Sequence, residues 1–228
     1  MSHTLKILLL LVLSIPAIAQ KIEVQQDLGA WIGIEIEKDL PKKFEWSLST
    51  QVRTSRNSSR LDSYLAQTGI GYRINKTFAL GGHVRYIHDR KSSSIQENSW
   101  RYHLDFKFKL KPLKKVTLAY RLRYQQKFID AFGRKKYPLA DIKSTIRHQI
   151  KMQWKVHKKH KLHTAAELFI AVHELDEYPY LDKIRLSLGD KIKTKIGTFD
   201  LSIGYEKNLQ ANDTFSFFFL KAIYQLSL

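Results

Sequence analysis

The stretch from Trp100 to Leu110 reads W-R-Y-H-L-D-F-K-F-K-L, and every second residue in it is large and apolar. The residues between them are polar or charged. Successive side chains of a β-strand point to opposite faces, so this alternation predicts a strand with one apolar and one charged face. At about 3.3 Å per residue, a strand of this length can cross a bilayer core when it is tilted.

The same alternation recurs in about eleven segments, with no domain linker or low-complexity tract between them. The turns between segments are short near Pro41, Asn75, Pro112, Lys158 and Gly197 and longer near Asn57, Ser93, Phe132, Glu177 and Ala211. Transmembrane barrels have short periplasmic turns and longer outer loops. The chain is therefore predicted to be all-β, an up-and-down antiparallel transmembrane β-barrel of about 10–12 strands, with its C-terminal strand end in the periplasm.

Aromatic residues lie toward the predicted strand ends, where membrane barrels carry interface girdles. The four tryptophans, Trp31, Trp46, Trp100 and Trp154, are assigned to these girdles. A soluble β-sandwich or lipocalin-like barrel would instead turn the apolar face inward, and period alone does not separate the two. The long segments, the asymmetric turns and the terminal aromatics favour the membrane barrel.

Eleven is an unexpected number of strands, because bacterial single-chain barrels have even counts. Two solutions stay open. The first segment, 28–38, bends at Gly29 or Gly33 and contributes two short strands, or it forms only a partial wall and leaves ten full strands.

The first nineteen residues predict a cleaved signal peptide. Lys6 supplies the cation, residues 7–13 the apolar core, and Ala17-Ile18-Ala19 a small-residue cleavage site before Gln20. Residues 20–228 are then one exported barrel domain, located in the outer membrane of a Gram-negative cell and expected to be a monomer. The chain has no cysteine, which excludes a lipoprotein anchor, disulfides and thiolate metal sites.

The formal net charge is +18, a balance that would suggest nucleic acid for a cytoplasmic protein. Here the cations alternate with apolar residues, and export also argues against nucleic acid. Membrane lipid, lipopolysaccharide and small anions are the expected partners.

Several segments resemble an outer-membrane family known only as domain of unknown function 2490. They are L-G-A-W-I-G-I-E-I-E-K-D-L (28–40), S-R-L-D-S-Y-L-A-Q-T-G-I-G-Y-R-I-N-K (59–76) and F-A-L-G-G-H-V-R-Y-I (78–87), with R-Y-H-L-D-F (101–106), L-R-Y-Q (122–125) and I-R-H (146–148). The resemblance covers essentially all of the mature chain. It implies an outer-membrane barrel and supplies no activity. The C-terminal aromatic usual in such barrels is replaced here by Leu228.

On the barrel reading, the polar face of each strand points into the lumen. The predicted lumen-facing charged cluster consists of Arg101, His103, Asp105, Lys107, Arg121, Arg123, Arg147, Glu167 and Arg185. Neighbouring strands bring opposite charges within reach, and we expect Asp105 to pair with Arg121 or Arg123, and Glu167 with Arg147 or Arg185.

No convincing catalytic constellation is present, and we predict no enzyme, no cofactor and no metal site. The candidate pairs are Ser99 with His88 or His103, and Ser144 with His148, but no nucleophile-elbow glycines accompany them. The histidines at 157, 160 and 163 lie among lysines that would repel a cation. The acidic run 174–177 lacks the ligand spacing and the glycine of a calcium loop.

The sequence thus favours a structural or binding barrel whose basic lumen is largely filled by its own side chains. Two alternatives are a narrow anion-selective, porin-like channel and an outer-membrane lipid-modifying enzyme.

Overall fold

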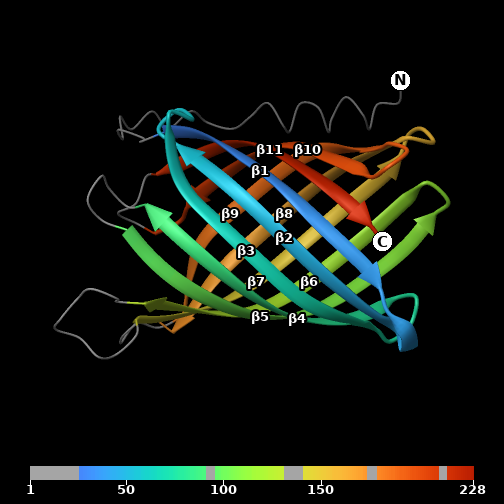
Figure 1. Ribbon diagram of the computed structural model, residues 1–228, viewed down its shortest axis with the longest axis horizontal. Coiled ribbons are helices and arrows are strands. Elements are labelled where there is room, and N and C mark those ends of the chain that lie inside the picture. The colour runs from blue at the N-terminus through green and yellow to red at the C-terminus, as the bar shows by residue number, and fades with distance from the viewer. Residues whose placement is uncertain (1–25, 91–95, 131–140, 174–178, 211–214) are drawn as a thin grey trace, which may run out of the picture.

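A computed structural model describes residues 26–90, 96–130, 141–173, 179–210 and 215–228, and shows one closed β-barrel (Figure 1). A single turn of 3-10 helix, Pro41–Lys43, joins the first two strands. The eleven strands are β1 (Gln26–Asp39), β2 (Phe44–Ser55), β3 (Arg60–Arg73), β4 (Phe78–Arg90), β5 (Gln96–Leu113), β6 (Val116–Asp130), β7 (Asp141–Lys155), β8 (His160–His173), β9 (Tyr180–Lys193), β10 (Thr198–Asn208) and β11 (Ser216–Ser227).

The barrel closes between its first and last strands. Every other pairing joins neighbours in the sequence and is antiparallel, whereas β1 and β11 run parallel from Gln26↔Ser216 to Glu37↔Ser227. An odd number of up-and-down strands requires this, because the first and last strands then point the same way. Both solutions to the strand number are wrong, since β1 is one uninterrupted strand that pairs with β11 and with β2.

The two ends of the barrel differ in their connections. The short-turn end holds the β1–β2, β3–β4, β5–β6, β7–β8 and β9–β10 turns, each of two to four residues, together with the end of β11. At the opposite, long-loop end, four of the five connections span five to ten residues. The exception is the β2–β3 connection of four residues, 56–59, so the prediction of a longer loop near Asn57 is wrong.

A tight turn is possible there because Arg56, Asn57 and Ser58 all adopt left-handed backbone angles, with φ of 53°, 54° and 63°. The Asp27 carboxylate on β1 accepts the backbone N–H groups of Arg56 and Asn57 at 2.9 and 2.8 Å. These bonds satisfy the turn and join it to the first strand.

The apolar face of the wall points outward, so the alternative arrangement with an apolar interior is wrong. In β5, Leu104 is 66% exposed, while the alternating His103 and Asp105 are 2% and 3% exposed. Long aliphatic and aromatic side chains are exposed around the whole barrel, including Ile32, Ile70, Ile150, Leu188, Ile203 and Leu220. In the part of the chain that the structure describes, no helix has the length and hydropathy to span a membrane.

Aromatic side chains pair across strands on the outer face, near each end of the barrel. Near the long-loop end the pairs are Tyr86–Trp100, Tyr102–Phe128 and Tyr205–Phe218, with ring centroids 5.2, 5.6 and 4.9 Å apart. Near the short-turn end they are Phe44–Tyr72, Phe78–Phe108 and Phe199–Tyr224, at 5.0, 5.2 and 4.7 Å. Aliphatic side chains occupy the band between them.

Trp31 does not belong to these outer belts, so its assignment to an interface girdle is wrong. It faces the interior, is 7% exposed, and stacks on Phe219 with ring centroids 3.8 Å apart and planes 8° from parallel. Trp31 and Phe219 lie on the two strands of the parallel closure, so their stacking covers the inner side of that junction. The Phe219 ring lies over Gly204 of β10, where a Cβ would come within 2.1 Å of Cζ of that ring.

A valine at position 204 tests this packing. Gly204→Val displaces the Phe219 ring and should lower the free energy of unfolding by about 1–3 kcal/mol, the usual cost of overpacking. Gly82→Val is the matched control, because a Cβ there meets only Leu104 Cδ2 at 3.7 Å. Urea unfolding of the refolded protein measures the difference. Equal stability of the two variants would contradict the packing described for the closure.

Candidate functional site

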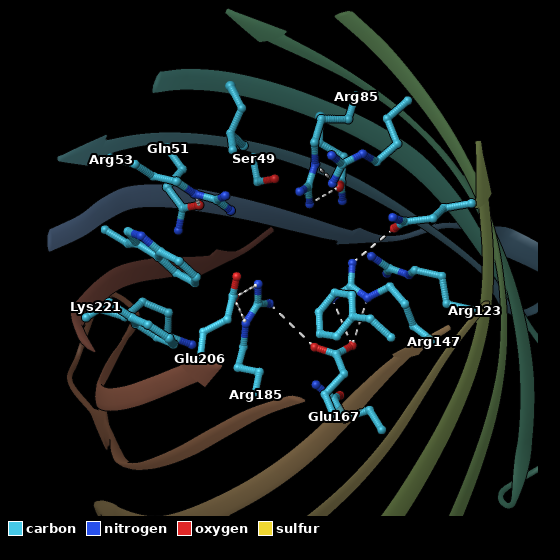
Figure 2. A pocket seen from close by; sticks show the side chains of 18 of the residues that line it. Ser49, Gln51, Arg53, Arg85, Arg123, Arg147, Glu167, Arg185, Glu206 and Lys221 are labelled. Atoms are coloured by element: carbon cyan, nitrogen blue, oxygen red, sulfur yellow. Dashed lines mark hydrogen bonds and ion pairs between the residues drawn. The ribbon is translucent and has the colours of Figure 1, made fainter. Parts of the chain in front are cut away.

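The barrel encloses a polar cavity of about 790 Å³. Its lining comes from the inward faces of all the strands, and Figure 2 shows arginines from different strands pointing into it. Among the described lining residues, twelve are lysines or arginines and nine are aspartates or glutamates. The cavity therefore carries a surplus of positive charge.

One carboxylate, that of Glu167 on β8, organises a filled side of the lumen. Glu167 is 2% exposed and accepts hydrogen bonds at Oε1 from Arg121 at 2.7 Å and from Arg147 at 3.1 and 2.8 Å. Its second oxygen, Oε2, accepts Arg185 at 3.5 Å. Three arginines from β6, β7 and β9 thus converge on one carboxylate.

Arg185 extends this network toward the barrel closure. Its guanidinium donates to Glu206 Oε2 from Nε at 2.7 Å and from Nη2 at 2.5 Å. It also lies 5.1 Å from the Trp31 ring centroid and 4.9 Å from that of Phe169. Arg147 also lies over the Phe169 ring, 4.4 Å from its centroid. Ion pairs and cation–π contacts therefore fill the lumen from β6 to β1.

Asp105 and Arg123 form a separate bidentate pair between β5 and β6. Arg123 Nε and Nη2 donate to the two carboxylate oxygens at 2.6 and 2.7 Å, and both side chains are buried. His103 lies beside them and stacks on His83 at 4.9 Å between ring centroids.

The structure places all nine residues of the predicted charged cluster on the interior face. Glu167 gathers three of them, Asp105 pairs with Arg123, and His103 stacks beside that pair. Lys107 and Arg101 border the cavity outside both groups.

The β1–β4 side of the lumen is lined by serines of β2 and by longer polar side chains, including Glu35, Gln51 and Gln67. Ser47 and Ser49 of β2 face inward, and their register partners on β3 are Gly69 and Gln67. The His83 imidazole folds against Gly69, where a Cβ would come within 2.0 Å of Nδ1.

Three arginines, on β2, β4 and β5, line the cavity and have no carboxylate within ion-pair distance among the described residues. Arg53 donates to Gln51 at 2.8 Å and stacks 4.3 Å from the Trp31 centroid. Arg85 donates to Gln67 at 2.9 and 2.5 Å. The Nε atom of Arg101 is buried and has no hydrogen-bond partner. We call Arg53, Arg85 and Arg101 the uncompensated triad.

Like charges meet directly within this triad. Arg85 and Arg101 are register partners across the β4–β5 ladder, an arrangement that costs stability when no anion intervenes. The charges of Arg101 and Arg53 both repel that of Arg85.

The predicted charged cluster omits two members of the triad, Arg53 and Arg85. Both occupy polar positions of their alternating segments, so the alternation by itself predicts that their side chains point into the lumen. That they lack counter-ions follows only from the strand register.

The structure does not assemble the candidate catalytic pairs. His88 faces outward, where its Nδ1 lies 2.6 Å from Asn98 Oδ1, whereas Ser99 faces inward. His103 and Ser99 share a face but are four residues apart along one strand. His148 bonds to the Tyr120 hydroxyl at 2.7 Å, and Gln126 donates to Ser144.

The described residues also contain no group that could hold a metal ion. His160 pairs with Asp190 at 2.6 Å and His163 with Asp200 at 3.1 Å. The acidic run 174–177 lies outside the described residues.

Comparison with known protein families shows which family the chain belongs to. The model of a protein family of unknown function, DUF2490, matches residues 28–218. The chain belongs to the DUF2490 family. No curated protein and no solved structure matches it, so membership supplies a family and leaves the function to the geometry.

Neutralising Glu167 tests the organisation of the filled side. Glu167→Gln removes the counter-charge of Arg121 and Arg147 and one of the two carboxylate partners of Arg185, and it should destabilise the barrel by about 3–5 kcal/mol. Glu35→Gln is the control, since Glu35 accepts its hydrogen bond from the neutral Gln225 amide. Chemical unfolding of both variants gives the comparison.

A second substitution makes that test specific. Arg147→Gln in the Glu167→Gln background should restore part of the lost stability. It removes one of the guanidinium charges that Glu167→Gln leaves without a carboxylate. A double variant less stable than Glu167→Gln alone would contradict the shared-counter-charge arrangement.

Proposed function

We propose that this DUF2490 protein is an outer-membrane barrel whose lumen binds a small oxyanion. The observation that carries the binding proposal is the uncompensated triad beside a polar cavity. The proposal of location is supported by the outward apolar face, by the two belts of aromatic pairs and by strands of 11–18 residues.

Guanidinium groups suit an oxyanion because their planar N–H forks match carboxylate, sulfate or phosphate oxygens. Arg85 and Arg101 face each other across the ladder, so one anion between them would replace repulsion by attraction. The buried Nε of Arg101 would gain an acceptor. Gln51 and Gln67 hold the neighbouring guanidiniums while leaving their charge unneutralised.

A narrow anion-selective channel is the second candidate, and one observation favours it. The lining of the cavity includes Asp27 and Asp62 at the long-loop end and Glu45 and Lys107 toward the short-turn end. We favour binding because the filled side occupies much of the lumen of a barrel of this size. No arrangement of described residues supports the lipid-modifying enzyme.

Location is tested by fractionation and by charge placement. The mature protein should be recovered with outer membranes and show heat-modifiable gel mobility; recovery in the soluble periplasm would refute the location. In the refolded barrel, Phe106→Arg on the outer face should cost about 2–4 kcal/mol, since it places a cation in the bilayer. If Phe106→Arg leaves the stability unchanged while Lys107→Leu lowers it, the inner and outer faces of the strand have been assigned the wrong way round.

Anion binding is tested by calorimetric titration of the refolded full chain with phosphate and sulfate at fixed ionic strength. Arg85→Gln and Arg101→Gln should each weaken binding by roughly tenfold or more, the effect of losing one charged hydrogen-bonding partner. Arg90→Gln, an exposed residue at the end of the same strand as Arg85, is the charge-matched control.

Absence of binding by the wild type, or equal weakening by Arg90→Gln, would overturn the oxyanion proposal. Planar-bilayer recordings separate the two candidates, since a binding lumen should give no stable conductance. A reproducible anion-selective current that falls with Arg121→Ala or Arg123→Ala would favour the channel.

A further inference from the structure

A second cavity opens at the short-turn end beside the β3–β4 turn and shares Glu45 and Lys107 with the lining of the lumen. Its volume is about 1,080 Å³, and we call it the rim groove. The start of β2, the β3–β4 turn at 74–77 and the end of β5 form it. Ile74, Leu80 and Leu110 belong to its apolar lining, and Lys76, Lys109 and Lys111 to its basic edge.

The rim groove combines an apolar lining with a basic edge. Ile74, Leu80 and Leu110 are 40–45% exposed, although they are large and aliphatic. They continue the outward apolar band of β3, β4 and β5, and the aromatic pairs Phe44–Tyr72 and Phe78–Phe108 lie at the same end. A ligand in this groove would meet acyl-compatible surface on one side.

On the other side it would meet cations with little to neutralise them. The lining holds six lysines or arginines and a single acidic residue, Glu45. Arg73 is held by Asp39 at 2.7 Å, and Lys43 donates to the Ile74 carbonyl at 3.1 Å. Lys76, Lys109 and Lys111 are exposed, and none of them forms an ion pair with any described residue.

We infer that the rim groove binds an anionic phospholipid from the leaflet at the short-turn end. This inference rests on the proposed membrane location. A phosphate headgroup satisfies the free lysines, and the acyl chains continue along the apolar lining. A soluble polyanion would use the lysines but leave the apolar surface in water. Each cation near an anionic membrane surface contributes appreciably to such binding, so removing the charges of the three free lysines should weaken it.

The experiment uses the full chain refolded in mixed vesicles of phosphatidylglycerol and phosphatidylcholine, followed by native mass spectrometry of the lipids that stay bound. The wild type should retain phosphatidylglycerol with roughly tenfold preference. A triple variant, Lys76→Gln with Lys109→Gln and Lys111→Gln, should lose that preference. High salt should weaken the preference of the wild type as well.

The control carries the same change in net charge on the same rim. Lys158→Gln with Lys159→Gln and Lys195→Gln alters exposed lysines that do not line the groove, and it should keep the preference. Ile74→Ser with Leu110→Ser should weaken retention of both lipids, because it removes the apolar contact while leaving the charge. Heat-modifiable mobility verifies that each variant is folded.

The outcomes separate the two proposals. Failure of the wild type to insert into vesicles would refute the membrane location itself. Insertion without lipid preference, or equal loss in the control variant, would overturn the rim groove as a lipid site and leave the location standing. Displacement of phosphatidylglycerol by lipopolysaccharide would overturn the assignment to the phospholipid leaflet.

Discussion

The Glu167 carboxylate determines how charge is distributed in this lumen. It accepts hydrogen bonds from Arg121, Arg147 and Arg185, which lie on three different strands. Burying an unpaired charge is costly, so this carboxylate draws the long side chains of β6, β7 and β9 together. The opposite side has small residues and arginines with glutamine partners.

The parallel junction of β1 with β11 is the second constraint, because it is where an odd barrel must close. Trp31 and Phe219 stack across its inner side, and Gly204 gives the Phe219 ring room to lie flat. Arg53 and Arg185 both lie over the Trp31 ring, at 4.3 and 5.1 Å. The closure therefore also positions one member of the uncompensated triad and links it to the filled side.

Much of this architecture could be predicted from the period of two. The strands, their facing and the inward placement of residues such as Asp105 and Arg123 follow from alternation alone. The predicted range of about 10–12 strands includes the eleven observed, and only the two solutions toward an even count were wrong, because β1 is one full strand. Trp31 was misplaced because tryptophan is typical of girdles, whereas its register puts it inside.

Which cations lack a partner is a property of register between strands, and a single sequence does not specify it. Arg85 opposes Arg101 rather than a carboxylate only because β4 and β5 pair as they do. The rim groove likewise depends on the end of β5 lying beside the β3–β4 turn, where Lys109 donates its backbone N–H to the Thr77 carbonyl at 2.8 Å.

The most direct test of an oxyanion in the lumen is anomalous diffraction from crystals of the protein grown with selenate, a heavy analogue of sulfate. The uncompensated triad should give a selenium peak within hydrogen-bonding distance of the Arg85 and Arg101 guanidiniums, and the space around Glu167 should give none. A lumen without such a peak, or a peak beside Glu167, would contradict the assignment of the triad as the anion site.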